Sequence, residues 1–318
     1  MRIVVTGANG FVGQHLVTEL EKRGIRPVRW VFGAADGLST GAGSTRQLDL
    51  RDVSQVGEAL RADAPERVVH LAARADVGAS FSALEPVWRL NVLATMGLAA
   101  ALREYNSAAG LVFASSGDSY GATFVDHQPV QEEHPLRPLN PYSASKAAAE
   151  VGLEQLRTSG GLALRIIRSF NCAGPGQASG FVVSDFARQV AEIKTGQGEA
   201  KISVGNLEAK RDFLDVRDAA RGYADVAMLP AETFSGPPVN LCSGKSRSIQ
   251  SVLDGLLALA DQPIAIEVDP ERLRPSDIPV AQGSYSRLHS LCGWQPERPF
   301  DQTLRDALAD WLARSSAG

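Results

Sequence analysis

Residues 2–6 (RIVVT) form a short β-branched run that ends in a glycine-rich turn, Gly7–Gly13 (GANGFVG). A helical pattern with Leu16, Val17 and Leu20 on one face follows directly. Glycines in such a turn let backbone amides approach a pyrophosphate, and the N-terminus of the next helix favours negative charge. The order of strand, turn and helix therefore predicts a dinucleotide-binding unit, with a ligand-free tight turn as the simpler alternative.

Strand-like and helical segments then alternate up to residue 170. The strand-like segments are 27–32, 47–50, 67–72, 110–115 and 162–170, and the helical ones are 54–62, 84–105 and 143–156. Such alternation predicts an α/β fold, a Rossmann-type doubly wound parallel sheet. Beyond 170 the pattern is interrupted at 174–176 (GPG) and 236–238 (GPP). We therefore expect a dinucleotide-binding domain over 1–170 with a return segment near 213–242, and a smaller substrate-binding α/β lobe over 171–318.

Composition excludes several other functions. The net charge is −4 with acids and bases mixed, which argues against a nucleic-acid partner. No apolar run approaches the length of about 20 residues that a membrane span needs, and no leader pattern opens the sequence. Cys172, Cys242 and Cys292 are odd in number and far apart, which is typical of reduced thiols and not of a metal site. These features predict a cytoplasmic protein without a bound metal, in contact with neither membrane nor nucleic acid.

The end of the second strand bears on the choice of cofactor. An NAD-type fold places an acid there to bind the ribose, but residues 31–33 are Val-Phe-Gly, and Asp36 comes late. Arg29 and Arg46 are weak candidates for a 2′-phosphate, and ordinary surface charge is the simpler interpretation of each. The sequence favours NADPH slightly and leaves NAD open.

A tyrosine and a lysine four residues apart, Tyr142 and Lys146, lie at the start of the segment 143–156. Helical spacing puts both on one face, where an ammonium would stabilise a phenolate. Ser116 follows a strand, and its hydroxyl is placed to bind a carbonyl oxygen as negative charge develops on it. A tyrosine–lysine pair alone usually means helix surface, so the order of all the motifs carries the prediction of an oxidoreductase.

Taken together, TGANGFVG, HLAA (70–73), NVLAT (91–95), SSGDSYG (115–121) and PYSASK (141–146) resemble the extended short-chain dehydrogenase/reductase family. The C-terminal motifs RSFNCAGPGQ, VGNLEAKRDFLDVRD, NLCSG and RLRPSDIPVAQGSYSRL look like the GDP-4-keto-6-deoxy-D-mannose reductases and, less closely, the GDP-mannose 4,6-dehydratases. The resemblance implies reduction of a GDP-linked 4-keto-6-deoxyhexose, with NADP or NAD as cofactor and GDP-D-rhamnose as product. It also implies a homodimer, in which the helices 84–105 and 143–156 build a four-helix bundle.

The resemblance also assigns roles to residues. Proton transfer falls to Tyr142, nicotinamide ribose binding to Lys146, and orientation of the keto oxygen to Ser116. The cofactor is met by Gly7, Gly10, Phe11, Val12, Gly13, Asp49, Leu50, Leu71, Ala72, Ala73, Tyr142 and Lys146, and the sugar nucleotide by Asn171, Arg211, Arg274 and Asp277.

Departures from the family pattern keep other activities open. Ser169 stands where proline is usual, and Cys172-Ala173 replaces His-Ile. Asp118 occupies the position of a dehydratase base, so a 4,6-dehydratase or a 4-epimerase that recycles its cofactor is the alternative to a reductase. A non-catalytic redox sensor is a remote alternative, because such a protein is expected to have lost the tyrosine or the lysine.

Overall fold

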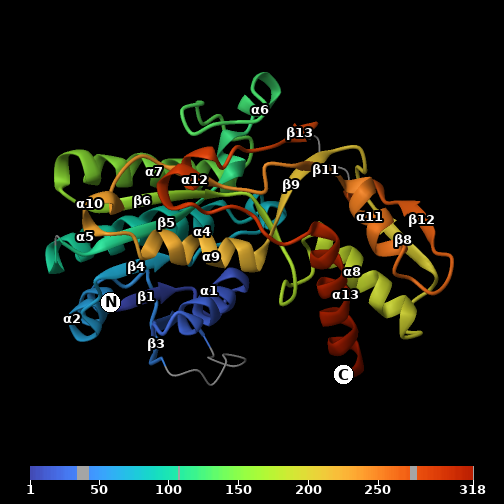
Figure 1. The fold of residues 1–318 in the computed structure, drawn as a ribbon, viewed down its shortest axis with the longest axis horizontal. Coiled ribbons are helices and arrows are strands. Elements are labelled where there is room, and N and C mark those ends of the chain that lie inside the picture. Colours follow the sequence, from blue (N-terminus) through green and yellow to red (C-terminus); the bar gives the residue numbers. More distant parts are fainter. Residues whose placement is uncertain (34–42, 107, 273–277, 318) are drawn as a thin grey trace.

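The computed structural model describes residues 1–33, 43–106, 108–272 and 278–317. Over these residues, a sheet of seven parallel strands runs in the order β10-β6-β5-β4-β1-β2-β3 (Figure 1). The strands are β1 (Ile3–Thr6), β2 (Val28–Val31), β3 (Thr45–Gln47), β4 (Arg67–His70), β5 (Gly110–Ser116), β6 (Ala163–Ser169) and β10 (Val239–Leu241). The order reverses beside β1, and ligands bind outside the carboxyl ends of strands at such a point.

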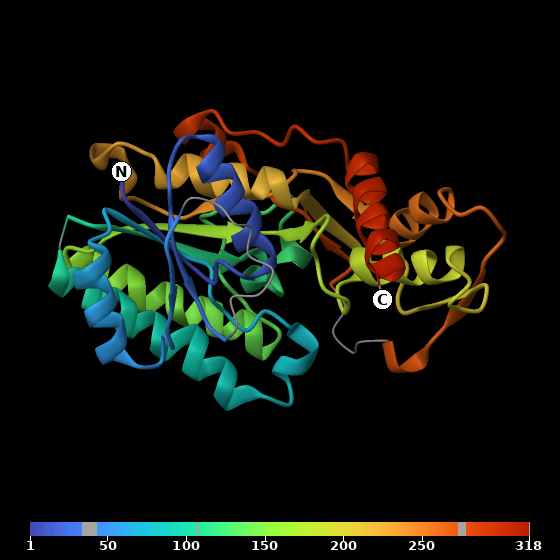
Figure 2. The ribbon, with the colours of Figure 1, turned by 90° about the horizontal axis from the view of Figure 1, so that it is seen from below.

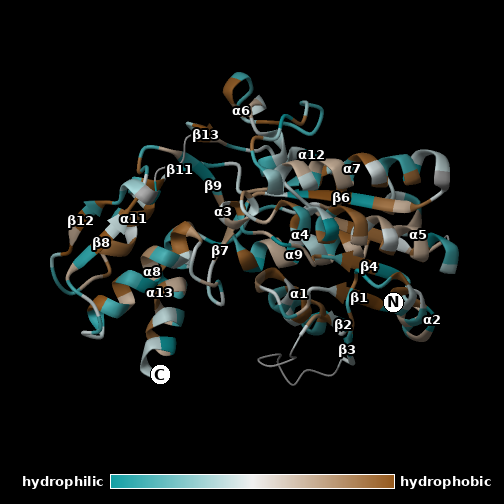
Figure 3. Ribbon diagram, turned by 180° about the vertical axis from the view of Figure 1, so that it is seen from behind, coloured by the Kyte–Doolittle hydropathy of each residue, from teal (hydrophilic) through white to brown (hydrophobic). Residues whose placement is uncertain are grey.

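Helices cover both faces of this sheet (Figure 2). One layer holds α1 (Phe11–Lys22) and α9 (Val216–Ala227), and the other holds α2 (Val53–Asp63), α5 (Thr95–Tyr105) and α7 (Pro141–Gly160). Because both faces are covered, the central strands are mostly apolar, and Figure 3 shows β1 and β4 among the hydrophobic segments. The shorter elements nearby are α3 (Val77–Ser80), α4 (Leu84–Trp88), η2 (Gly117–Tyr120), α6 (Thr123–Asp126), α10 (Ala231–Phe234) and α12 (Ser286–Cys292).

The predicted long helix over 84–105 is interrupted. A π-helical turn, η1 (Arg89–Ala94), separates α4 from α5. Inside this turn the buried amide of Asn91 accepts from the backbone N–H of Arg74 (2.9 Å), and donates to the carbonyl of Arg74 (3.1 Å) and the hydroxyl of Ser145 (3.0 Å). The wider turn therefore contains the residue that joins this helix to the loop after β4 and to α7.

Most of the chain beyond 170 forms a second, smaller group of elements. It contains β7 (Asn171–Ala173), α8 (Val182–Lys194), β8 (Lys201–Val204), β9 (Lys210–Asp215), β11 (Ser246–Ser248), α11 (Ile249–Leu257), β12 (Ala265–Val268), η3 (Pro270–Arg272), β13 (Val280–Ala281) and α13 (Phe300–Ala317). Its apolar core lies between α8, α11 and α13. No helix among the described residues has the length and apolar character needed to cross a bilayer.

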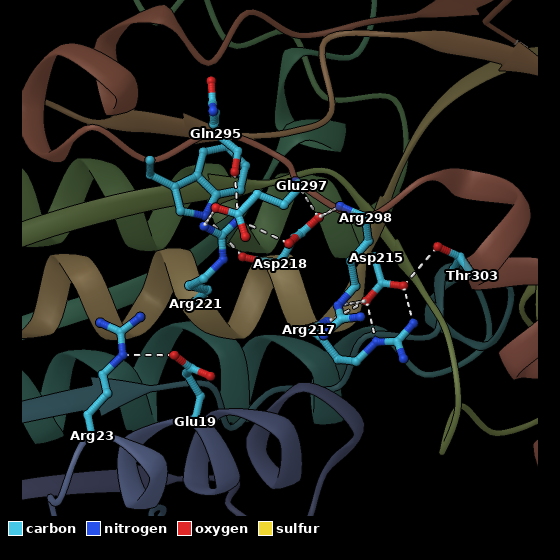
Figure 4. A network of polar contacts seen from close by, with 11 residues as sticks. Glu19, Arg23, Asp215, Arg217, Asp218, Arg221, Gln295, Glu297, Arg298 and Thr303 are labelled. Carbon is cyan, nitrogen blue, oxygen red and sulfur yellow. Dashed lines mark hydrogen bonds and ion pairs between the residues drawn. The ribbon is translucent and has the colours of Figure 1, made fainter.

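Strand β10 and helix α9 come from beyond residue 170 but lie with the large sheet. The strand pairs with β6, and the helix packs on α1. The start of α9 also binds the C-terminal segment (Figure 4). Asp218 accepts from the backbone amides of Glu297 and Arg298, both at 2.9 Å, and Asp215 accepts from the hydroxyl of Thr303 at 2.8 Å. These buried carboxylates fix the segment that leads into α13 against the helix that covers the sheet.

Candidate active site

The glycine-rich turn lies at the carboxyl edge of the sheet, between β1 and α1. Gly7 has a φ of +66°, and a Cβ on it would lie 2.9 Å from the backbone of Ala72, just after β4. A Cβ on Gly13 would overlap the carbonyl oxygen of Gly7. Only glycine fits at both positions, so the turn brings the start of α1 against the ends of β1 and β4.

The first turn of α1 is open to an anion. Its N-cap is Gly10, which provides no side-chain cap. The amides of Phe11, Val12 and Gly13 therefore have no helical acceptor, and together with the helix dipole they suit the oxygens of a pyrophosphate. The residues that the sequence assigns to a dinucleotide fit that group.

His70 joins two of the strand ends behind this turn. One ring nitrogen lies 2.7 Å from the hydroxyl of Thr6, and the other lies 2.9 Å from the hydroxyl of Thr95. The hydroxyl of Thr6 also accepts from the backbone N–H of Ala72 at 3.2 Å. Burial lowers the pKa of His70 to about 3, so its ring is neutral and structural.

At the adenine end, the predicted pair Asp49 and Leu50 follows β3. Arg51 binds Asp49 at 2.6 Å, which lowers the pKa of that carboxyl, and its guanidinium lies over the ring of Phe32, 5.4 Å from the centroid. The simpler interpretation of Arg29 is surface charge, but its side chain is buried. The guanidinium of Arg29 donates to the carbonyl of Gly43 at 2.8 Å. Arg46 is paired with Asp63, and Asp36 lies outside the described residues.

Tyr142, Ser116 and Lys146 are brought together at the ends of β5 and α7. Asn140 caps α7 with its side chain, Pro141 opens the helix, and Tyr142 is its second residue. The hydroxyl of Ser116 accepts the amide of Asp118 (3.1 Å) and bonds to Tyr142. Because its oxygen already accepts that amide, its hydrogen is directed to the phenol or to an oxygen bound beside it.

The charges of this group are set mainly by burial. Burial raises the pKa of Tyr142, the charge of Asp118 raises it further, and the bond from Ser116 opposes them. Burial lowers the pKa of Lys146 to about 8, against the opposing charge of Glu150. The ammonium donates to the carbonyl of Ala114 at 2.7 Å and lies 4.9 Å from the centroid of the Phe113 ring. Because the pKa of Tyr142 is raised, its phenol is protonated at neutral pH.

Two of the four predicted sugar-nucleotide residues lie in the described part of the chain. Asn171 is exposed at the start of β7, which pairs with β9, and Arg211 is on β9. The guanidinium of Arg211 donates to the carbonyl of Ile278 at 2.7 Å. Arg274 and Asp277 lie outside the described residues.

The sequence did not indicate a second phenol near the reaction centre. Tyr223, on α9, is buried and bonds to Ser169, and Tyr142 and Cys172 are close enough to affect its pKa, which burial raises. The side chains of Ser169 and Cys172 lie 3.5 Å apart. The two departures from the family pattern thus form one polar group with Tyr223. The apolar spacing of α9 predicts burial but not this neighbour.

The model of the family described as GDP-mannose 4,6 dehydratase matches residues 4–307. The chain belongs to this family. It lies within the extended short-chain dehydrogenase/reductases, and the predicted Rossmann-type fold is confirmed.

Members of the family and its neighbours include reductases and epimerases. The chain is 34% identical to GDP-6-deoxy-D-mannose reductase of Pseudomonas aeruginosa, over 98% of each protein. The structure of RMD from the same organism, complexed with NADPH, matches with a TM-score of 0.82 and 32% identity, over 98% of this chain and 99% of that one. UDP-glucose 4-epimerase of Thermus thermophilus with NAD matches with a TM-score of 0.86 and 29% identity, with the same coverage.

Proposed function

We propose that the protein reduces the C4 ketone of a GDP-linked 4-keto-6-deoxyhexose with NADPH, converting GDP-4-keto-6-deoxy-D-mannose to GDP-D-rhamnose. The observation that carries this proposal is the similarity over the whole chain to a GDP-6-deoxy-D-mannose reductase, combined with Ser116, Tyr142 and Lys146 at one strand edge. When bound, the nicotinamide supplies the hydride for C4. The residues of the chain supply the proton, the orientation and the charge.

Each of the three residues has a distinct task. Tyr142 gives its phenolic proton to the oxygen of the ketone as that oxygen becomes an alkoxide, and its raised pKa keeps the proton in place until then. Ser116 donates its hydrogen to the same oxygen and fixes the carbonyl beside Tyr142. The ammonium of Lys146 holds the nicotinamide ribose and stabilises the phenolate that remains.

Binding of the two ligands follows from the arrangement of charge. The uncapped start of α1 takes the cofactor pyrophosphate, and residues 49–50 and 71–73 border its adenosine and central parts. The absence of an acid at residues 31–33 supports NADPH over NADH. Asn171, Arg211, Arg274 and Asp277 are assigned to the sugar nucleotide, and an arginine suits its diphosphate because one guanidinium binds two oxygens at once.

Further parts of the proposal concern the whole chain. The cofactor domain spans 1–170 with the return segment 213–242, and the lobe 171–318 carries the substrate. The protein is also a homodimer, in which the helical segment that ends in α5 and the helix α7 form a four-helix bundle with the same helices of a second copy. In support, Leu93 on η1, just before α5, is 67% exposed and Val151 on α7 is 70% exposed, although both side chains are apolar. A cytoplasmic location stays a prediction.

Thermal unfolding with a panel of ligands tests the ligand classes. A ligand that binds only the folded protein raises the melting temperature in proportion to its affinity and concentration. We expect NADP to stabilise more than NAD, and GDP more than UDP or dTDP. Stabilisation by UDP but not by GDP would contradict the assignment of the sugar nucleotide.

Asp118 gives a specific reason to keep a dehydratase as the second candidate. Its charge acts on Tyr142, and it is the second residue of η2, two positions after Ser116. In a dehydratase, the oxidised cofactor would accept the hydride from C4, and a base in this place would remove the C5 proton as the C6 hydroxyl leaves as water. The hydride would then return to C6. Such an enzyme consumes no reduced cofactor, so the stoichiometry of the reaction separates the two candidates.

A further inference from the structure

A buried ion pair lies directly behind the reaction centre. Glu150 on α7 binds Arg168 on β6, with 2.8 Å between the carboxylate and a terminal guanidinium nitrogen, and a second guanidinium nitrogen donates to both carboxylate oxygens. Ser115, next to Ser116 on β5, also donates to Glu150. The side chains of Glu150 and Arg168 are only 5% and 7% exposed. The three hydrogen-bonded residues therefore hold a negative charge at a fixed place under the catalytic helix.

Lys146 is a buried cation with no ion pair of its own within the described part of the chain. Its exposed fraction is 3%, and its partners are the carbonyl of Ala114 and the face of the Phe113 ring. A buried ammonium that has only neutral partners tends to lose its proton. Glu150 is four residues further along α7, and residues at this spacing are neighbours on one face of a helix.

Of the other titratable groups discussed above, none supplies a negative charge to Lys146. His70, on β4, is neutral because burial lowers its pKa to about 3. Arg168 approaches from β6, but its guanidinium is bound to Glu150. Asp118, on η2, acts on Tyr142. The carboxylate of Glu150 is the negative charge that acts on Lys146 from within its own helix.

We propose that Glu150 is a positioning residue that keeps Lys146 in its ammonium form, while Arg168 and Ser115 hold the carboxylate in place. The effect on catalysis rests on the proposed function, because a neutral Lys146 could no longer stabilise the phenolate of Tyr142. Removing the charge of Glu150 lowers the pKa of Lys146, so activity is lost at a lower pH on the alkaline side. An opposite charge about 4–6 Å away shifts a pKa by about 1–3 units, and sharing the carboxylate with Arg168 places the effect near the lower limit.

The test compares Glu150→Gln with Ser115→Ala. The first removes the charge and keeps the shape, whereas the second removes one hydrogen bond and keeps the charge. The chain has six lysines, so NMR of protein labelled with 13C at lysine Cε resolves the titration of Lys146, assigned from the spectrum of Lys146→Met. We expect a midpoint about one unit lower in Glu150→Gln and a much smaller shift in Ser115→Ala, because the carboxylate keeps its charge and its bonds to Arg168.

This measurement needs neither substrate nor cofactor, so it stands even if the proposed reaction is wrong. In the active enzyme, the alkaline limb of kcat/KM against pH should move with the NMR midpoint, because that ratio reports groups of the free enzyme. If Glu150→Gln does not fold, Arg168→Gln replaces it, because this change leaves the Glu150 carboxylate without its counter-charge and the Lys146 midpoint should then rise. A folded charge-removed variant whose Lys146 midpoint equals that of the wild type overturns the inference, and so does an equal shift in Ser115→Ala.

Discussion

The proposed reaction depends on a phenol, that of Tyr142, which keeps its proton until the ketone oxygen becomes an alkoxide. Burial and Asp118 both raise the pKa of Tyr142, which suits a proton donor at neutral pH. Replacing Tyr142 by Phe should lower kcat by about 10²–10⁴-fold, the usual contribution of a positioned general acid, and leave NADPH affinity unchanged. Steady-state kinetics and calorimetry measure the two effects, with Tyr105→Phe on α5 as control. Full activity in Tyr142→Phe would remove this residue from the mechanism.

Gly10 allows the backbone of the turn to approach a pyrophosphate. A Cβ at this position would lie 3.1 Å from the carbonyl of Gly7, so a larger residue is tolerated with a small shift but extends toward the ligand. We expect Gly10→Val to lose most of its NADPH affinity while its circular dichroism spectrum stays that of the wild type. Gly57→Ala, in the middle of α2, is the matched control, because a Cβ there would make only an ordinary contact with the Arg61 side chain at 3.7 Å. Normal cofactor binding by Gly10→Val in calorimetry would show that the pyrophosphate lies elsewhere.

Among the elements, the π-helical turn η1 depends on one buried amide. Asn91→Leu would leave the N–H and carbonyl of Arg74 without these partners, at a cost of about 1–3 kcal/mol in the free energy of unfolding. Urea denaturation measures this loss, and Arg103→Ala, exposed on α5, should change the stability little. Equal stability of the two variants would mean that Asn91 does not support the turn.

Some of the strands and helices could be predicted from the sequence, and others could not. The strands at 110–115 and 162–170 are apolar runs between turn signals, and the spacing of Tyr142 and Lys146 follows from the motif itself. The sequence predicts a return segment near 213–242, but it could not predict that β10 pairs with β6, because this pairing joins segments far apart in the chain. Glu150 carries no local signal either, since its partner Arg168 comes from a neighbouring strand and only the folded sheet brings the two together.

For the whole molecule, the proposed dimer puts the exposed apolar side chains of Leu93 on η1 and Val151 on α7 in contact with a second copy. Val151→Glu would bury a charge in that interface and should give a monomer at micromolar concentration by light scattering. Val125→Glu is the matched control, because Val125 is also 70% exposed but lies on α6. A wild-type monomer, or an unchanged dimer in Val151→Glu, would exclude this interface.

The proposed activity of the whole molecule is most directly tested by the stoichiometry of one reaction. Purified protein is mixed with GDP-4-keto-6-deoxy-D-mannose and NADPH, the absorbance of the reduced cofactor is followed, and the product is identified by NMR. We predict that one NADPH disappears for each keto sugar consumed and that the product is GDP-D-rhamnose. Unchanged keto sugar and NADPH in this mixture, together with conversion of GDP-mannose to the keto sugar without loss of NADPH in a parallel one, would contradict the reductase and favour Asp118 as the base of a dehydratase.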